Sequence, residues 1–247
     1  MHPHLFQFGR LVLPTYGFLL ALGAILSLLV CVRIARLLSL DPDKIWKVAV
    51  LAIVTALLGN RIFLAMSRWP RYGFASEFPA SVIAAVAAAV YALRLGLPLR
   101  RTADAFAPSL ALSSSIVSIA CLEAGCDYGT PTHLPWAVVF KSPADLPRAM
   151  LGVPLHPTQL YASLAEFALF VVLTWLLHRP HYDGEVLGAW LFLAGLSSFL
   201  LTFLRGDSGP LVSGLLTATQ LVAAAMVLAG GVLWLHRPQS ARVSHGG

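Results

Sequence analysis

Two arginines, a histidine and an aspartate stand inside or directly beside long apolar stretches of this 247-residue chain. Arg61 lies within one stretch and His156 precedes another, while Arg205 and Asp207 follow a third. An ionisable residue within an apolar span is costly and is a functional candidate by default. The planar guanidinium of arginine suits phosphate, because it donates paired hydrogen bonds. These residues therefore favour binding of a phosphate group, for which a phospholipid headgroup is the natural source.

Further polar residues stand near the same ends of the apolar stretches: Tyr16, Asn60, Glu77, Gln159 and Tyr161. Amide and phenol groups supply the hydrogen bonds that hold a polar ligand. Histidine and glutamate side chains accept protons in catalysis. His156 and Glu77 are therefore the candidate general bases.

Each of these residues also has a structural interpretation. Arg61 can extend its guanidinium to the membrane surface, and Arg205 and Asp207 can form an ordinary ion pair. His156 can simply precede a helix that Thr158 caps, because a residue before proline disfavours continued helix. Tyrosines commonly gather at membrane interfaces. The functional interpretation depends on whether the fold brings these residues to one place.

Seven apolar stretches must position these side chains. Of all residues 58% are hydrophobic and only 11% are charged, whereas a soluble domain is nearer a quarter charged. A bilayer-spanning helix needs about 20 mostly apolar residues. The sequence therefore predicts an all-α polytopic membrane protein, with 1–247 forming one integral membrane domain. We expect seven transmembrane helices at 13–32, 46–66, 79–97, 104–122, 158–177, 186–204 and 211–235.

The basic residues indicate the orientation in the membrane. With the N-terminus outside, the inner loops and C-terminal tail hold ten basic residues, and the outer segments hold six. This bias favours an N-out, C-in topology. The net charge of +6 is therefore assigned to topology and not to nucleic-acid binding, because the basic residues are spread over short loops. In this orientation Tyr16, Arg61, Glu77, His156 and Arg205 all approach the outer face, which predicts a single polar site there.

The longest connection runs over residues 123–156 and is rich in proline and glycine. Such a stretch is usually a functional loop or a disordered one. Trp136, Val138, Val139 and Phe140 lie among its prolines and glycines and favour packing. We therefore expect an outer-face cap over 123–156.

The chain contains three cysteines, Cys31, Cys121 and Cys126, which form no C-x-x-C pair. No histidine-rich tract accompanies them, so the sequence predicts neither a metal site nor a cofactor. Cys121 and Cys126 are expected to be small packing residues and not nucleophiles.

The segment His-Pro-Thr-Gln-Leu-Tyr at 156–161 resembles the His-Pro-Thr/Ser-Gln-Leu-Tyr motif of the prolipoprotein diacylglyceryl transferases. Three further stretches resemble that family: Tyr16-Gly17, the Gly-Asn-Arg-Ile-Phe segment at 59–63, and the arginine-bearing segment at 201–207. The loop at 126–139 is similar to that of a branch carrying Cys-Cys-Tyr-Gly-Lys-Pro-Thr-Asp-Leu-Pro-Trp. The likeness covers most of the chain in the same order.

This resemblance implies a phospholipid-dependent transferase at the outer face of a bacterial inner membrane. The family transfers the diacylglyceryl group of phosphatidylglycerol to the cysteine thiol of a prolipoprotein signal peptide, and glycerol phosphate leaves. By resemblance, Arg205 holds the phosphate, Tyr16 lines the lipid site, and Gly129 lets the loop backbone approach the lipid. The expected catalytic residues are Arg205, His156, Glu77 and Tyr16. The expected substrate-binding residues are Arg61, Asn60, Gln159, Tyr161 and Gly129.

The chain departs from the family pattern at four places. Ser118 and Ala120 stand where the family signature has arginine and glycine, and Ala162 stands where a glutamate is common. The segment 75–79 lacks the histidine that many members carry. These changes permit two alternatives: a paralogue with another acceptor, or a non-catalytic lipid-binding protein. Transport is less favoured, because the midplane of most spans carries no charge.

Overall fold

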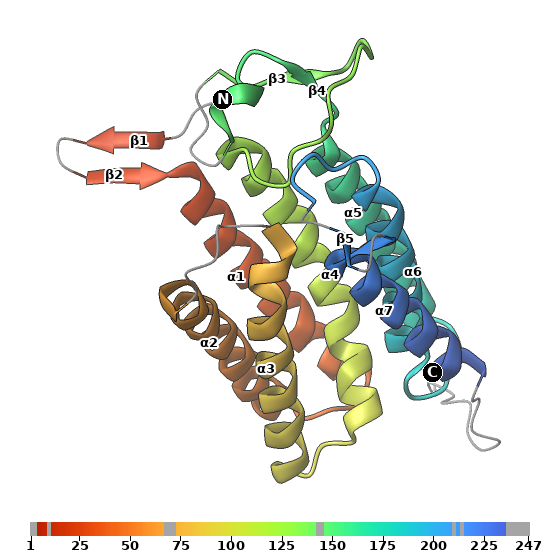
Figure 1. Cartoon of the computed structure of the whole chain (residues 1–247). Helices are drawn as coiled ribbons and strands as arrows, with labels where there is room; N and C mark the ends of the chain where they lie inside the picture. The colour runs from red at the N-terminus through yellow and green to blue at the C-terminus, as the bar shows by residue number, and fades with distance from the viewer. Residues whose placement is uncertain are drawn as a thin grey trace.

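The computed structural model describes residues 4–8, 11–66, 73–141, 146–208, 211–212 and 215–235. Seven long helices form a bundle within these ranges (Figure 1). They are α1 (Thr15–Leu37), α2 (Pro42–Met66), α3 (Gly73–Arg94), α4 (Leu99–Ala124), α5 (Thr158–Leu177), α6 (Glu185–Thr202) and α7 (Ala218–Leu235). Six of them are long and apolar enough to cross a membrane, and the apolar part of α3 is the shorter helix Pro79–Arg94. The all-α membrane fold is confirmed.

Three short antiparallel hairpins accompany the helices in the described part of the chain. They are β1 (His4–Phe8) with β2 (Leu11–Pro14), β3 (Val138–Val139) with β4 (Pro154–Leu155), and β5 (Leu211–Val212) with β6 (Leu216–Thr217). A short 3₁₀ helix, η1 (Arg148–Met150), lies between β3 and β4. The β1–β2 and β3–β4 hairpins lie at one end of the bundle, which we call the outer end, and α7 ends toward the other (Figure 1).

Two helices end close to glycines in the left-handed backbone region. As a result α3 ends before the residue that hydropathy predicted, and α4 ends after it. Gly96 has φ +71°, and the following Leu97 donates back to the carbonyl of Ala92 at 3.0 Å. Gly125 has φ +84° and ends α4 at Ala124. Only glycine adopts this backbone region without steric cost, which is why it commonly follows a helix. The predicted ends at 97 and 122 were therefore misplaced by two or three residues.

The predicted start of the last span, at 211, was wrong. Leu211 and Val212 pair with Leu216 and Thr217 in a hairpin, and α7 begins at Ala218. The predicted start of the first span was also early, because Leu13 belongs to β2. Apolar residues alone do not distinguish a strand that adjoins a span from the span itself.

Helix α4 is the centre of the bundle and packs against α1, α5 and α6, while α2 pairs with α3 and α6 with α7. The α6–α7 contact depends on small residues. A Cβ atom on Gly230 would lie 2.5 Å from the backbone nitrogen of Phe192, and one on Gly195 would lie 2.8 Å from the carbonyl oxygen of Ala223. Glycines therefore allow the two backbones to approach, as is usual for helices that pack within a membrane.

A buried carboxylate joins α4 to α6 at the inner end. Asp104 accepts hydrogen bonds from the backbone nitrogens of Gly184, at 2.6 Å, and Leu187, at 2.8 Å. Arg101 and Asp183 add an ion pair at 3.0 Å nearby. Because the first N–H groups of a helix have no intrahelical partner, Asp104 satisfies the start of α6 and holds the inner ends together.

Candidate functional site

The loop that follows α4 crosses the outer end between the end of α6 and the start of α5. The Thr130 nitrogen donates to the Leu204 carbonyl at 2.8 Å, and the Gly206 nitrogen donates to the Tyr128 carbonyl at 2.8 Å. On its other side, the His156 nitrogen donates to the Thr130 carbonyl at 3.0 Å. Backbone hydrogen bonds thus fix three segments that lie far apart in the sequence at one place.

Two glycines make this close approach possible. A Cβ atom on Gly129 would lie 2.4 Å from the carbonyl oxygen of His156. A Cβ atom on Gly206 would lie 2.7 Å from the Tyr128 ring and 2.9 Å from the Gly129 carbonyl oxygen. The approach that the structure shows at Gly129 is therefore to His156, and an approach to lipid stays a prediction.

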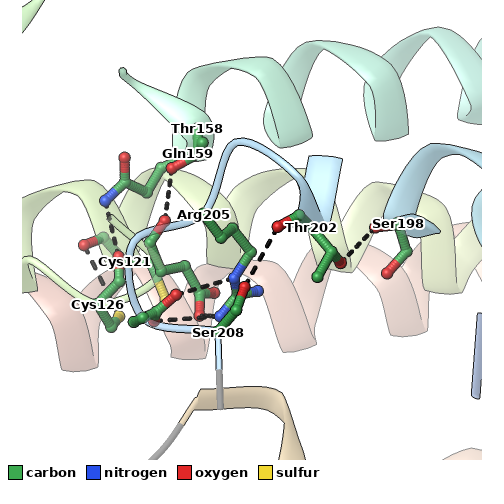
Figure 2. Close-up of polar contacts among 10 residues, drawn as sticks. Cys121, Cys126, Thr158, Gln159, Ser198, Thr202, Arg205 and Ser208 are labelled. Atoms are coloured by element: carbon green, nitrogen blue, oxygen red, sulfur yellow. Dashed lines mark hydrogen bonds and ion pairs between the residues drawn. The ribbon is translucent and has the colours of Figure 1, made fainter. Parts of the chain in front are cut away.

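Two side chains at the start of α5 bind the beginning of the loop that follows α4 (Figure 2). The Thr158 hydroxyl donates to the Asp127 carbonyl at 2.6 Å, and the Gln159 amide donates to the Cys126 carbonyl at 2.7 Å. The prediction that Thr158 caps α5 was wrong. Pro157 occupies the N-cap position, and the Thr158 hydroxyl is directed to the loop instead.

Arg205 lies between two carboxylates. It binds Asp207 through Nε at 3.0 Å and Nη2 at 3.2 Å, and Nη2 also donates to Asp127. The side chains of Arg205 and Asp207 are 15% and 14% exposed, whereas that of Asp127 is 37% exposed. One cation thus faces two anions, and Asp127 is the member that solvent reaches most easily.

The ionisation of this cluster follows from burial and charge. Burial by itself lowers the pKa of Arg205, but Asp127 and Asp207 outweigh it and raise that pKa above its ordinary value. Burial raises the pKa of Asp127, and Arg205 offsets only part of that effect. Arg205 therefore stays charged, and Asp127 takes up a proton more readily than an ordinary aspartate.

Aromatic side chains adjoin His156. The His156 and Tyr161 rings lie edge to face with centroids 6.3 Å apart. The Trp136 indole nitrogen donates to the Tyr161 hydroxyl at 2.7 Å, and Trp136 is 56% exposed. The His156 Nδ1 atom is buried and has no hydrogen-bond partner among the described residues. Trp136 was not predicted as a site residue, because an aromatic residue in a loop is equally typical of packing.

The structure brings together five of the predicted site residues: Gly129, His156, Gln159, Tyr161 and Arg205. Tyr16 lies in the first turn of α1, which begins at the same outer end. Asn60 and Arg61 lie on α2, where the Arg61 residue is exposed and the Asn60 Oδ1 atom is buried without a partner among the described residues. No contact described for the chain joins Arg61 to Arg205 or His156.

Glu77 lies in the first part of α3, but its side chain is outside the described atoms. Of the two candidate bases, only His156 therefore has a described environment. Its unpartnered ring nitrogen lies next to a partly exposed tyrosine and an exposed tryptophan. Three of the five guanidinium hydrogens of Arg205 meet carboxylates, and the two on Nη1 have no partner among the described residues.

Comparison with known proteins gives a consistent set of relatives. The chain matches the family described as prolipoprotein diacylglyceryl transferase over residues 3–236. A phosphatidylglycerol–prolipoprotein diacylglyceryl transferase of Finegoldia magna is 29% identical over 231 residues, which cover 88% of each chain. That of Clostridium tetani is 27% identical, covering 93% of this chain and 95% of its own. That of Synechococcus elongatus is 28% identical, covering 95% of this chain and 87% of its own.

Proposed function

This chain belongs to the prolipoprotein diacylglyceryl transferase family, and we propose that it works from its outer-end cluster. It is a multi-pass membrane transferase of the phosphatidylglycerol–prolipoprotein diacylglyceryl transferase type. We propose that the donor is phosphatidylglycerol and that the acceptor is the cysteine thiol of a prolipoprotein signal peptide. The relatives that carry this activity in their names align along most of the chain.

One observation supports this assignment most directly. The His-Pro-Thr-Gln-Leu-Tyr segment, the glycine loop and the arginine after α6 are the stretches that carry the family resemblance. Backbone hydrogen bonds join all three, through Gly129, His156 and Arg205, at one end of the bundle. The place where they meet also holds a histidine nitrogen without a hydrogen-bond partner among the described residues. This combination favours a shared functional site over three separate structural roles.

The reaction requires two things of the protein, a base and a group that stabilises the leaving phosphate. The sulfur of the acceptor forms a bond to the glycerol carbon of the lipid while the carbon–oxygen bond to phosphate breaks, and glycerol phosphate leaves with the electron pair. The thiol proton must pass to a base, for which His156 Nδ1 is the described candidate. The leaving phosphate must be stabilised, which we assign to Arg205 because preorganised cationic donors are a major source of catalysis. Glu77 stays the second candidate for the base.

Arg205 has to exchange a partner to bind phosphate. In the resting cluster two carboxylates already oppose its charge, so an added phosphate meets net repulsion. Asp127 is the carboxylate that leaves more easily, because its side chain is more exposed than that of Asp207. Its raised pKa also favours protonation, which would weaken its hold on Arg205. We infer that phosphate binding displaces Asp127 and keeps the Arg205–Asp207 pair.

We further propose that the chain lies in a bacterial inner membrane with the N-terminus and the cluster outside. The basic residues favour this orientation. The outer end of Figure 1 then faces the compartment in which prolipoproteins are exposed, and α7 ends toward the opposite side. Arg61, exposed on α2, is proposed to contact lipid headgroups from the same side.

Lipid binding without transfer is the second candidate function. Ser118 replaces an arginine of the family signature, and both carboxylates already engage Arg205. A site with fewer available cations could hold the donor without activating it.

A transfer assay separates the two functions. The purified full chain is incubated with vesicles of labelled phosphatidylglycerol and a lipobox peptide, with a peptide carrying serine for cysteine as the control. The proposed function predicts a peptide product heavier by one diacylglyceryl group together with released glycerol phosphate. Retention of phosphatidylglycerol without product would support the second function and reject the first.

A further inference from the structure

A polar stripe runs down the inward face of α5 from the site toward the middle of the bundle. Gln159, Ser163 and Glu166 are spaced four and three residues apart, so they lie on one face of the helix. The same face continues below them as the buried residues Leu169, Leu173 and Leu177. Glu166 therefore points into the bundle and not toward lipid, at a depth of about 12 Å below the start of α5.

Polar atoms along this stripe are buried without partners. The His156 Nδ1, Gln159 Oε1 and Glu166 Oε2 atoms all lack a hydrogen-bond partner among the described residues. Gln159 is only 1% exposed, and its amide nitrogen already binds the Cys126 carbonyl. An unsatisfied buried acceptor destabilises the folded state, because its hydrogen bond to water is lost and not replaced. Packing alone does not explain a row of them, and a carboxyl at membrane depth is a functional candidate.

Helix α4 is less buried beside Glu166 than nearer its start. Most residues of α4 between 102 and 111 are buried, whereas between 112 and 119 only Ser115 is. Ser115 donates to the Ser163 carbonyl at 2.9 Å, which places this part of α4 against the stripe. Glu166 itself is only partly buried, although it lies at the centre of a face whose neighbours above and below are buried.

The chemistry of the stripe selects the kind of ligand. A carboxylate accepts hydrogen bonds through two oxygens and repels phosphate. A ligand group beside Glu166 must therefore carry donors. In phosphatidylglycerol the phosphate is followed by a glycerol with two adjacent hydroxyls, which match the two oxygens of a carboxylate. Helical side chains lean toward the helix N-terminus, so the Glu166 carboxyl leans toward the outer end of α5, the end at which Arg205 lies.

We propose that Glu166 accepts hydrogen bonds from the headgroup hydroxyls of phosphatidylglycerol and so selects this lipid as the donor; this rests on the function proposed above. Gln159 lines the path between Glu166 and the phosphate. The lipid headgroup thus spans from Arg205 at the outer end to Glu166 within the bundle.

Competition binding tests the proposal. A fluorescent phosphatidylglycerol bound to the detergent-solubilised full chain is displaced by phosphatidylglycerol, phosphatidic acid or phosphatidylethanolamine with the same acyl chains. The wild type should prefer phosphatidylglycerol to phosphatidic acid, which lacks the hydroxyls. Glu166→Leu should lower that preference about tenfold, which corresponds to ~1.4 kcal/mol. Glu166→Gln should keep most of it, because an amide oxygen also accepts from a hydroxyl.

Stability and a matched variant keep the test decisive. Removing an uncompensated carboxyl should leave the thermal midpoint of Glu166→Leu unchanged or raised. Glu185→Gln at the inner end should bind like the wild type. An unchanged lipid preference in Glu166→Leu would overturn the proposal, and so would a lowered midpoint with equal loss of all lipids. Both Glu166→Gln and Glu166→Leu could instead lose affinity for phosphatidylethanolamine alone, and to the same extent. That result would indicate that Glu166 binds an ammonium group, and it would also overturn the proposal.

The failure of this proposal is distinct from failure of the transferase function. If the wild type makes lipidated peptide while Glu166→Leu keeps its preference for phosphatidylglycerol, only the role of Glu166 is rejected. If the wild type makes no product, the transfer assay rejects the proposed function, and the binding data still report on Glu166.

Discussion

Arg205 binds the carboxylate of Asp207, which lies two residues further along the chain, with two nitrogens. Nε lies at 3.0 Å and Nη2 at 3.2 Å from the carboxylate oxygens. This forked contact holds the guanidinium in one orientation. Asp127, from a loop 78 residues away, meets the same Nη2 atom. Asp207 thus positions the arginine, and we infer that Asp127 is the partner that a bound phosphate replaces.

Replacing Arg205 by lysine should cost more activity than the unchanged charge suggests. Lysine cannot reproduce the forked contact with Asp207, and hydrogen bonds to charged groups contribute about 1.5–3 kcal/mol. We expect transfer to fall at least about tenfold. The measurement is the rate of peptide lipidation, with Arg148→Lys on η1 as the matched control. Equal rates in both variants and the wild type would refute a role for the guanidinium geometry.

Asp127→Asn should change how stability depends on pH. Burial raises the pKa of Asp127 on folding, above the ordinary value of about 3.9. A carboxyl raised in this way stabilises the fold when protonated, and that contribution is lost as pH rises through the raised pKa. The variant should therefore match the wild type at low pH and exceed its thermal midpoint at about pH 8. A variant less stable than the wild type at pH 8 would show that the ion pair with Arg205 outweighs burial.

Gly129→Ala should disrupt the site. The added Cβ would lie 2.4 Å from the His156 carbonyl oxygen, so the backbone must move. Overpacking of this kind costs about 1–3 kcal/mol. We expect a lower thermal midpoint and reduced transfer. Gly231→Ala on α7 is the control, because a Cβ there meets nothing within 4 Å. A normal midpoint for Gly129→Ala would mean that the loop does not need this close approach.

Trp136 and Tyr161 should behave as one unit. Their hydrogen bond of 2.7 Å joins the loop to α5 beside His156. Trp136→Phe and Tyr161→Phe each remove it, so the double variant should lose little beyond either single one. The expected coupling is about 0.5–1.5 kcal/mol, measured from transfer rates in a double-mutant cycle. Fully additive losses would show that the two side chains act independently.

The proposed topology is testable without the reaction. Reporter fusions after Arg101 and at Gly247 should both indicate the cytoplasm. The reason is the excess of basic residues on that side. An outer signal from either fusion would remove the argument that the cluster faces the outer compartment.

Much of the site could be read from residue types near the ends of apolar stretches. His156, Gln159, Tyr161, Gly129 and Arg205 were all predicted, and the structure places them together. Glu166 and Trp136 were not. Glu166 sits within a predicted span, but whether a helical residue faces lipid or protein depends on the neighbouring helices. The partners of a loop tryptophan are likewise set by segments distant in sequence.

The sequence by itself determined the membrane fold. A run of about 20 apolar residues is a local property of the chain, and it is sufficient for a helix to span the bilayer. It also predicted that the candidate site residues lie near the same ends of the apolar stretches. Only the tertiary structure decided that Arg205 faces Asp127 and that Asp104 holds the start of α6. It also decided that 211–212 form a strand outside the last helix. These outcomes depend on contacts between segments that lie apart along the chain, and such contacts leave no periodic pattern in the segments themselves.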